Sequence, residues 1–261
     1  MNKIISDAMW NEIKDLIPDR REGSVGRPRA DKRKILEGMF YILITGAQWS
    51  KLPNEYGPPS TVHGWMRIWT DSGLFQRIRN IMATRYLKKT GMTINWLSID
   101  TSYSKAPFAT FSGKNPTDRG RMGVKKSIVV DWNGAPLAAF ADAANKHDVK
   151  FLEPTLANFF QYNQRPDKPV VLTADSAFDS KQLRKSCAKN NIALLAANNV
   201  RRSKNQKLYK PGHRWVVERT FGWMSWFRGL KTCWVKKIEM FLAFLDLALI
   251  KVLFRMGGIF E

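Results

Sequence analysis

The sequence has little cysteine and little histidine, and both shortages exclude classes of protein. Its two cysteines, Cys187 and Cys233, form no CxxC pair and are too few for a disulfide framework. A reducing compartment, and hence a cytoplasmic protein, is therefore expected, with both cysteines as small core residues rather than nucleophiles. The three histidines are scattered without the spacing of a zinc site.

Long apolar runs are also absent. The longest segment without a charged side chain, residues 38–50, is too short and too polar to cross a bilayer. The apolar segment 238–256 is interrupted by four charged residues and is expected to be a core helix. The first eighteen residues carry three acidic side chains and lack the apolar centre of a signal peptide. We therefore expect no membrane anchor, neither a signal peptide nor a segment that crosses a bilayer.

Negative charge is the third shortage. The 261 residues include 43 Lys and Arg but only 22 Asp and Glu, a formal net charge of +21. With 44% hydrophobic and 12% aromatic residues, the composition is that of a folded protein rather than a disordered basic tail. Because so many excess positive side chains repel one another in a compact chain, we expect a polyanionic partner. Nucleic acid is the partner that fits best, and an anionic membrane surface is the alternative.

Residues 1–92 show helical patterns throughout and are expected to form an all-α domain. Ser6 is expected to cap the first helix and Pro18 to stop it, and Thr45-Gly46 to end a second helix over about 31–44. Ser60-Thr61 is expected to cap a third helix, and Gly73 separates it from a fourth. The helices over 31–44 and from residue 60 are separated by a short, punctuated turn, which suggests a helix-turn-helix.

The charge of this region favours DNA binding over the alternative of an ordinary helical bundle with a solvated face. Between residues 19 and 34 there are seven basic residues against three acidic ones. The helix after residue 60 would present its polar face to DNA. The DNA-contacting residues expected here are Arg27, Arg29, Arg33, Ser60, Thr61, His63 and Arg67.

From residue 93 to 261 the pattern changes to strands alternating with helices. A strand over 96–99 is expected to end at Asp100, and a short apolar strand over 169–174 to end at Asp175. The Asn133-Gly134 pair between two apolar runs predicts a β-hairpin, with Asp131 at the start of its turn. A helix is expected over 149–160 and a further strand over 192–196. The order strand, hairpin, helix, strand, helix, strand and final helices predicts a mixed α/β sheet covered by helices. Asp179 is expected to cap a helix.

Three carboxylates stand out in this second domain. Asp100 and Asp175 follow apolar strands, where a charge is costly unless it is paired or binds a cation. Glu218 is the sole acidic residue between residues 200 and 237, on a helix expected to begin near Gly212 with Arg214 on the same face. Three such carboxylates suit a pair of Mg²⁺ ions. The alternative interpretation makes the aspartates strand-end caps and pairs the glutamate with a nearby arginine.

Four segments resemble, in order, the bacterial transposases of insertion-sequence family 5, within the wider insertion-sequence 4/5 group. They are residues 26–69, 113–138, 144–148 and 214–230, and the resemblance runs almost end to end. The last of them, RWVVERTFGWMSWFRGL, resembles the signature around the catalytic glutamate. The resemblance implies an RNase H-like sheet preceded by a helix-turn-helix-like helical domain.

The resemblance also implies a catalytic triad. It places the three metal-binding carboxylates on Asp100 in SIDTSYSKA, Asp175 in LTADSAFDS and Glu218 in VVERTFGW. Two Mg²⁺ ions, replaceable by Mn²⁺, would support cleavage of terminal inverted repeats and joining of the 3′-hydroxyls to target DNA. The assembly would be a homodimer or larger. A silent DNA-binding descendant and a nuclease on the same fold are the alternatives.

This chain departs from many relatives of that family at several positions outside the triad. Ser225 stands where they carry lysine, residues 176–178 replace a basic residue, glycine and tyrosine, and Cys233-Trp234 replaces Arg-Tyr. None of these positions is one of the three carboxylates. They bear instead on contacts to transposon-end DNA.

Basic and aromatic residues complete the predicted DNA interface. The tryptophans between residues 215 and 234 interleave with cations, as in platforms for unstacked bases. At helical spacing such aromatics are more often core residues, and we favour that interpretation. The contacts expected in this domain are Arg119, Arg121, Lys125, Lys126, Arg214, Arg219, Trp223 and Arg228.

Overall fold

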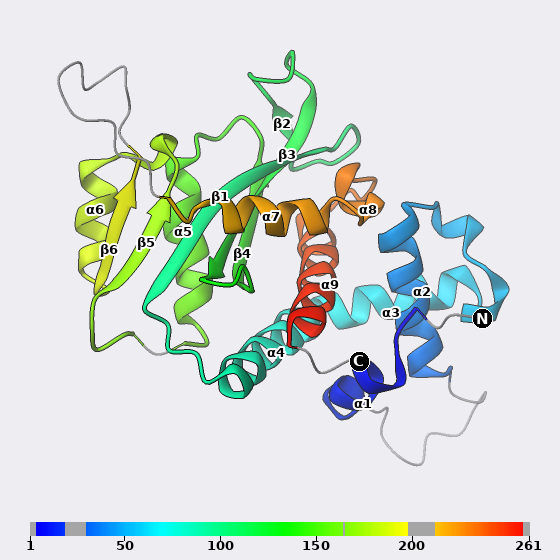
Figure 1. Cartoon of the computed structure of the whole chain (residues 1–261). Helices are drawn as coiled ribbons and strands as arrows, with labels where there is room; N and C mark the ends of the chain where they lie inside the picture. Colours follow the sequence, from blue (N-terminus) through cyan, green and yellow to red (C-terminus); the bar gives the residue numbers. More distant parts are fainter. Residues whose placement is uncertain (1–3, 19–29, 164, 198–211, 258–261) are drawn as a thin grey trace.

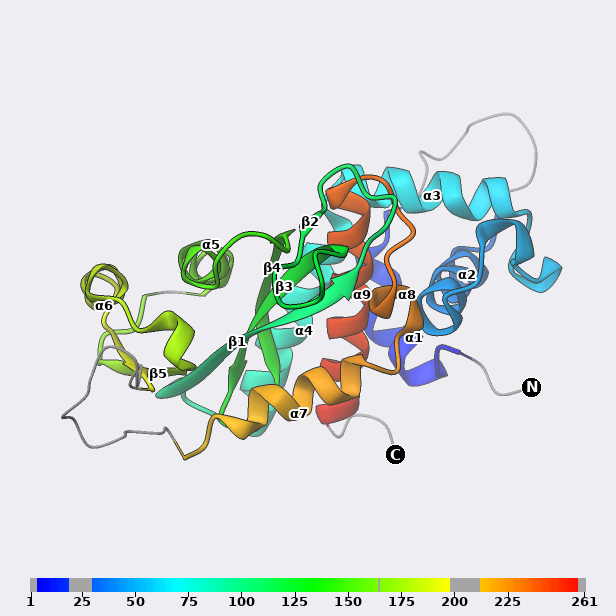
Figure 2. The same cartoon turned by 90° about the horizontal axis from the view of Figure 1, so that it is seen from above.

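The structure is a computed structural model that describes residues 4–18, 30–163, 165–197 and 212–257 (Figures 1 and 2). No helix in these ranges is both long enough and apolar enough to span a lipid bilayer. Two of the predicted DNA contacts, Arg27 and Arg29, lie outside the described residues.

The described part of the N-terminal region contains four α-helices. Their bounds are α1 (Asp7–Ile13), α2 (Lys32–Thr45), α3 (Pro59–Asp71) and α4 (Leu74–Thr90), with 3₁₀ turns η1 (Lys14–Leu16), η2 (Trp49–Lys51) and η3 (Asn54–Tyr56). The predicted Ser6 cap of the first helix is confirmed, and the second helix begins next to Asp31, where it was predicted. The Ser6 hydroxyl accepts from the Met9 amide, and the Asp31 carboxylate accepts from the amides of the first turn of α2.

The start of α3 differs from the prediction. The helix begins at Pro59, one residue before Ser60-Thr61, and its N-cap is Pro58 without a side-chain hydrogen bond. Proline suits the first helical position because its missing N–H would have no partner there and its φ is already helical. The predicted Ser60-Thr61 cap is therefore wrong.

The connection between α2 and α3 is also longer than a helix-turn-helix turn. It spans residues 46–58 and contains η2 and η3, whereas the motif uses three or four residues. The segment packs on α2, where a Cβ added at Gly38 would lie 3.0 Å from the Tyr56 Cβ. The short punctuated turn lies instead between α3 and α4, at Ser72 and Gly73.

A six-stranded mixed sheet forms the second half, as predicted. The strands are β1 (Trp96–Lys105), β2 (Gly113–Lys114), β3 (Met122–Asp131), β4 (Pro136–Ala143), β5 (Val170–Ala174) and β6 (Ile192–Ala196). Strand β3 pairs antiparallel with β1, β2 and β4, and β5 joins β1 and β6 in parallel. Apart from the two-residue β2, the antiparallel strands β4, β3 and β1 are continued by the parallel strands β5 and β6, which is the RNase H-like arrangement.

Strand β1 runs further than predicted. It pairs with β3 from Leu97 opposite Asp131 to Lys105 opposite Gly123, so Asp100 lies within the strand and not at its end. The predicted end was wrong because residues 100–105 are mostly polar and carry no apolar strand pattern. Their strand conformation depends on pairing with β3.

The hairpin between β3 and β4 is confirmed, with Asp131 as its structural centre. The Asp131 carboxylate accepts from the amides of Asn133 (3.0 Å) and Ala135 (2.7 Å) and from the Tyr86 hydroxyl (2.9 Å). Gly134 adopts φ +84°, a conformation that favours glycine in such turns.

Helices cover both faces of the sheet. The bounds are α5 (Val149–Phe160), α6 (Lys181–Ala188), α7 (Trp215–Met224), α8 (Arg228–Lys231) and α9 (Ile238–Met256), with η4 (Ser176–Phe178) after β5. Figure 2 shows α5 and α6 on one side and α7 crossing the other. Ser180 caps α6, so the predicted Asp179 cap is wrong, and Asp179 pairs with Arg184 at 2.8 Å instead.

Helix α9 is the predicted core helix and joins the two halves. It packs along α4 and against β4, and its buried Asp246 pairs with the buried Arg79 of α4 at 2.6 Å. The hydrophobic core is one continuous cluster from α1 to α9. The division of the chain after residue 92 remains a prediction.

Candidate active site

The register of two parallel strands brings Asp100 and Asp175 together. Leu97 pairs with Leu172 and Ser98 with Thr173, an offset of 75 residues. The same offset relates Asp100 to Asp175, which directly follows β5 in extended conformation. Residues in register on neighbouring parallel strands point to the same side of the sheet. The two aspartates therefore share one edge of the β1–β5 junction.

Helix α7 supplies the third carboxylate on that side of the sheet. Arg214, at the N-cap of α7, donates to Asp100 Oδ2 at 2.9 Å and lies 2.5 Å from Glu218 Oε1, one turn along the helix. One guanidinium thus bridges two of the three carboxylates. The pairing of Glu218 with an arginine, which the alternative interpretation expected, is present.

The charges at this edge act on one another. Burial is the largest cause that raises the pKa of Asp100, to about 6, and the nearby Asp175 and Glu218 also raise it. The Thr101 amide, at 2.8 Å from Asp100 Oδ1, and Arg214 oppose this rise. Asp100 therefore interacts with both other members of the predicted triad.

The donor set fits hard cations, although its atoms are not gathered into a cage. All three side chains offer carboxylate oxygens, which Mg²⁺ prefers. Within the described ranges, no group of three His, Cys, Asp or Glu side chains is arranged to hold a metal ion. Arg214 lies between Asp100 and Glu218, and its positive charge balances theirs where a bound cation would do so.

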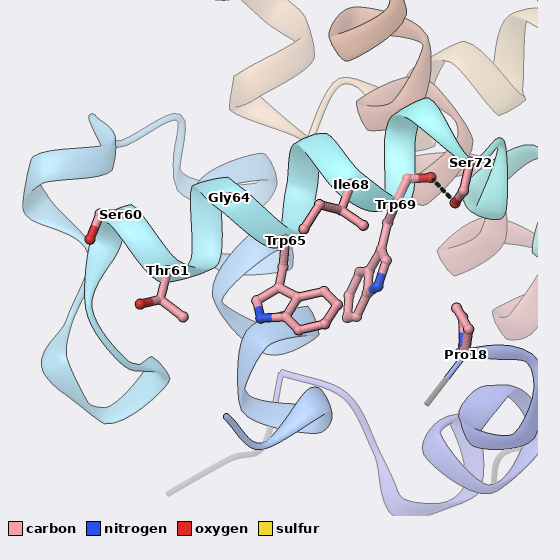
Figure 3. Close-up of a pocket in the computed structure, with 8 residues that line it drawn as sticks. All are labelled: Pro18, Ser60, Thr61, Gly64, Trp65, Ile68, Trp69 and Ser72. Atoms are coloured by element: carbon pink, nitrogen blue, oxygen red, sulfur yellow. Dashed lines mark hydrogen bonds between the residues drawn. The ribbon is translucent and has the colours of Figure 1, made fainter. Parts of the chain in front are cut away.

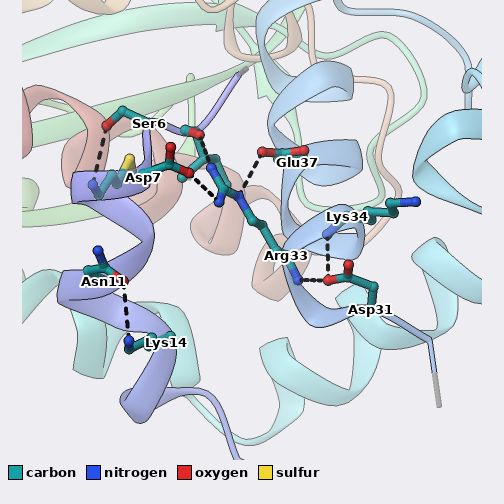
Figure 4. Close-up of polar contacts among 10 residues, drawn as sticks. Ser6, Asp7, Asn11, Lys14, Asp31, Arg33, Lys34 and Glu37 are labelled. Atoms are coloured by element: carbon teal, nitrogen blue, oxygen red, sulfur yellow. Dashed lines mark hydrogen bonds and ion pairs between the residues drawn. The ribbon is translucent and has the colours of Figure 1, made fainter.

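Several predicted DNA contacts are engaged inside the protein. Arg33 donates to Asp7 (2.5 Å) and to Glu37 (3.2 Å), as Figure 4 shows. It also donates to the Ile5 carbonyl at 2.8 Å. Lys126 is only 6% exposed, and burial lowers its pKa to about 8. Its ammonium donates to the Ser104 hydroxyl at 2.8 Å. The donors of Arg33 and Lys126 are therefore directed at partners within the protein and not at solvent, where DNA would bind.

Two further predicted contacts also have partners within the protein. Lys125 pairs with Asp148 at 2.8 Å beside α5, on the face of the sheet opposite α7. The Arg219 guanidinium lies 4.7 Å from the ring centre of Trp215 and 4.9 Å from that of Trp223, and it donates to the Asn133 carbonyl. Arg219 therefore fixes an indole–guanidinium–indole stack on α7.

The remaining predicted contacts lie at the surface or along a groove. Arg67, Arg119, Arg121 and Arg228 are exposed. Ser60 and Thr61 line a groove of about 610 Å³ with Trp65, Ile68 and Trp69 (Figure 3). His63 is half-buried with its ring edge-on to Trp49, and burial together with Arg67 lowers its pKa.

The tryptophans were predicted to be core residues, and for three of them this is wrong. Trp215 is 49%, Trp226 79% and Trp234 58% exposed. Sequence reasoning did not predict a further exposed aromatic residue, Trp132, which is 46% exposed. Its ring stacks on that of His213 with 3.5 Å between the ring centres. Its place in the hairpin turn was the signal, because turn residues lie at the surface.

Both cysteines are buried core residues, as predicted, and burial raises the pKa of each thiol to about 11. A thiol with so high a pKa is almost entirely protonated at neutral pH. This agrees with the expectation that neither is a nucleophile.

Comparison with known families identifies the family of the chain. Residues 93–252 match the family described as a transposase DDE domain. The chain belongs to the DDE transposase family. Residues 5–79 match a second family, described as "Putative transposase of IS4/5 family". Both matches agree with the resemblance to insertion-sequence transposases.

Individual relatives match parts of this chain. The chain is 37% identical over 140 residues to a "Putative transposase for insertion sequence element IS402" of Burkholderia cepacia, covering 52% of this chain and 65% of that protein, just under two thirds of its length. A second IS402 protein of the same organism is 31% identical over 108 residues, covering 40% of this chain and 74% of that protein. A solved piggyBac transposase synaptic complex with hairpin DNA aligns over 95% of this chain and 70% of that one, with TM-score 0.49 and 12% identity.

Proposed function

We propose that this chain is a DNA transposase that cleaves the terminal inverted repeats of its element and joins the freed 3′-hydroxyls to target DNA. The observation that carries the proposal is that Asp100 in β1 and Asp175, directly after the parallel neighbour β5, lie near enough for their charges to interact, with Glu218 linked to Asp100 through Arg214. Family membership agrees with this chemistry.

In this proposal Asp100, Asp175 and Glu218 hold two Mg²⁺ ions, with Mn²⁺ as a substitute. Bound there, the ions would activate the attacking oxygen and stabilise the leaving oxygen of a phosphodiester. The chain's own part is to present ionised carboxylates at fixed positions. The sheet fixes Asp100 and Asp175, and α7 fixes Glu218.

Duplex DNA is the proposed partner. The exposed arginines Arg67, Arg119, Arg121 and Arg228 would contact phosphates, which position DNA without reading its sequence. The exposed indoles on and beside α7, with Trp223, offer stacking faces for unpaired bases near a cut. The helical N-terminal region would recognise the terminal repeats, and pairing of two ends would require a homodimer or larger assembly.

A silent DNA-binding protein is the second candidate, favoured by one observation. Arg214 already satisfies Asp100 and Glu218, so these carboxylates have a structural partner without any cation. Binding of the element's end without metal-dependent cleavage would support this candidate.

The test is cleavage of a labelled duplex that carries the element's end. Asp100→Asn, Asp175→Asn and Glu218→Gln should each reduce cleavage at least about a thousandfold and leave DNA binding within about threefold, since each removes a charge from the site rather than from the DNA interface. Asp142→Asn is the matched control because Asp142 pairs with Lys146 outside the site. Near-normal cleavage by one triad variant would remove that residue from the proposed triad.

A further inference from the structure

The side chain of Arg214 stands between two members of the proposed triad and contacts both. Its Nη1 lies 2.9 Å from Asp100 Oδ2, and its Nη2 lies 2.5 Å from Glu218 Oε1. The other oxygen of Asp100 accepts from the Thr101 amide at 2.8 Å. Both oxygens of Asp100 therefore have donors before any cation arrives.

A guanidinium in this position competes with a divalent cation for the same oxygens. Two positive charges within a few ångströms repel strongly at a partly buried site. The Asp100 and Arg214 side chains are only 20% and 24% exposed, so water screens this repulsion poorly. A cation that binds Asp100 and Glu218 must therefore displace Arg214 or bind more weakly in its presence.

Arg214 has an alternative partner in the proposed substrate. A phosphate offers paired oxygens that match the fork of a guanidinium as well as a carboxylate does. Arg214 begins α7 on the side of the helix that carries Glu218, so a phosphate bound there would lie next to the carboxylates. Transfer of Arg214 to that phosphate would leave Asp100 and Glu218 with an uncompensated negative charge.

We infer that Arg214 is a positioning residue that couples divalent-cation binding to DNA binding, by neutralising Asp100 and Glu218 until a DNA phosphate takes their place. The inference rests on the proposed function, because it takes the three carboxylates to be the cation site. In the free protein the cation binds weakly. In the DNA complex it binds tightly, and by linkage the cation strengthens DNA binding by the same factor.

The experiment measures Mn²⁺ binding from the electron paramagnetic resonance signal of free Mn²⁺. Wild type, Arg214→Ala and Glu218→Gln are titrated alone and with a pre-cleaved end duplex whose 3′ terminus is a dideoxynucleotide, so that no strand is joined. Arg85→Ala is the matched control, because it removes one positive charge from an ion pair with Glu12, an N-terminal residue outside the site. Circular dichroism confirms that each variant is folded.

We expect the duplex to tighten Mn²⁺ binding by wild type and Arg85→Ala at least about tenfold, within the usual range of coupling between two sites. Arg214→Ala should bind Mn²⁺ about tenfold more tightly than wild type without DNA and gain less than about threefold from the duplex. Equal Mn²⁺ affinity of wild type and Arg214→Ala without DNA, together with weakened binding by Glu218→Gln, would overturn the coupling and leave the cation site standing. Unchanged Mn²⁺ binding by Glu218→Gln would overturn the proposed site itself.

Discussion

Asp100 is the residue whose surroundings most constrain the chemistry of the site. Its side chain is 20% exposed, against 53% for Glu218, and it faces two other carboxylates. Burial, followed by the charges of Asp175 and Glu218, raises the pKa of Asp100 to about 6 in the protein without bound cations. A carboxyl of this kind is only partly ionised in mildly acidic solution.

The stability of the free protein should therefore depend on the ionisation of Asp100. Because the folded pKa lies above the unfolded value of 3.8, the folded state holds this proton more tightly, and the resulting stabilisation is present below about pH 4 and is lost as pH rises through 6. Asparagine does not titrate, so Asp100→Asn should not lose this stabilisation. Its unfolding free energy relative to wild type should therefore be about 1–2 kcal/mol higher at pH 8 than at pH 4. Urea unfolding at the two pH values measures the difference.

Asp142→Asn provides the comparison, because the half-buried Asp142 pairs with the exposed Lys146 outside the site. A difference between Asp100→Asn and wild type that stays constant from pH 4 to pH 8 would show that Asp100 does not titrate in this window.

Single residues were predictable where their local pattern decides their role. Asp100, Asp175 and Glu218 could be selected from apolar strands and from the scarcity of acidic residues around Glu218. The internal use of Arg33 could not, because its partner Asp7 lies 26 residues away in the sequence. A cation looks the same in sequence whether it faces solvent or a carboxylate of another helix.

At the scale of elements, the position of Glu218 depends on how α7 packs on the β3–β4 hairpin. The Thr220 hydroxyl donates to the Gly134 carbonyl at 2.7 Å, and Arg219 donates to the carbonyl of Asn133. A Cβ at Gly134 would lie 2.9 Å from Thr220 Oγ1 and 3.2 Å from the Val216 carbonyl oxygen. The hairpin turn and the helix are therefore in direct contact.

Gly134→Ala should displace α7 and with it Glu218. We expect a loss of about 2–3 kcal/mol in unfolding free energy, since alanine at φ +84° is strained by about 1–2 kcal/mol and the Cβ also meets α7. Cleavage should fall more than about tenfold while DNA binding persists.

Gly120→Ala separates the two causes. Gly120 has a similar φ of +70° but no atom within 4 Å of an added Cβ, so only the strain should appear, about 1 kcal/mol, with cleavage unchanged. Equal effects of both substitutions on cleavage would contradict a role for the hairpin in placing α7.

Elements with strong local signals were predictable, and those fixed by neighbours were not. The helix over 149–160 and the strand over 192–196 have the predicted bounds. Strand β1 exceeds its predicted end because β3 pairs with it as far as Lys105. The connection over 46–58 exceeds the predicted turn because its buried Leu52 and its tyrosine pack against α2.

For the whole molecule, the net charge of +21 predicts DNA binding that weakens steeply with salt. Among the arginines predicted to contact DNA, some are exposed in the structure, such as Arg67 and Arg121. Others, such as Arg33, are paired with carboxylates within the protein. Composition alone predicts the polyanionic partner but cannot make this division.

Arg67→Ala and Arg121→Ala should each reduce the slope of log affinity against log salt concentration by about 0.9, because each lost phosphate contact releases one counterion fewer. Arg33→Ala should leave the slope unchanged. Fluorescence anisotropy with a labelled end duplex at several salt concentrations gives these slopes. A reduced slope for Arg33→Ala alone would reverse the assignment.

The measurement that tests the central claim most directly is strand joining. A pre-cleaved, labelled end duplex is incubated with supercoiled target plasmid and wild-type protein or Glu218→Gln, in Mg²⁺ and in EDTA. A transposase with this triad joins the labelled 3′ end to the plasmid in Mg²⁺ only, and Glu218→Gln does not. Folded wild-type protein that binds the duplex in Mg²⁺ but yields no joined product would contradict the account.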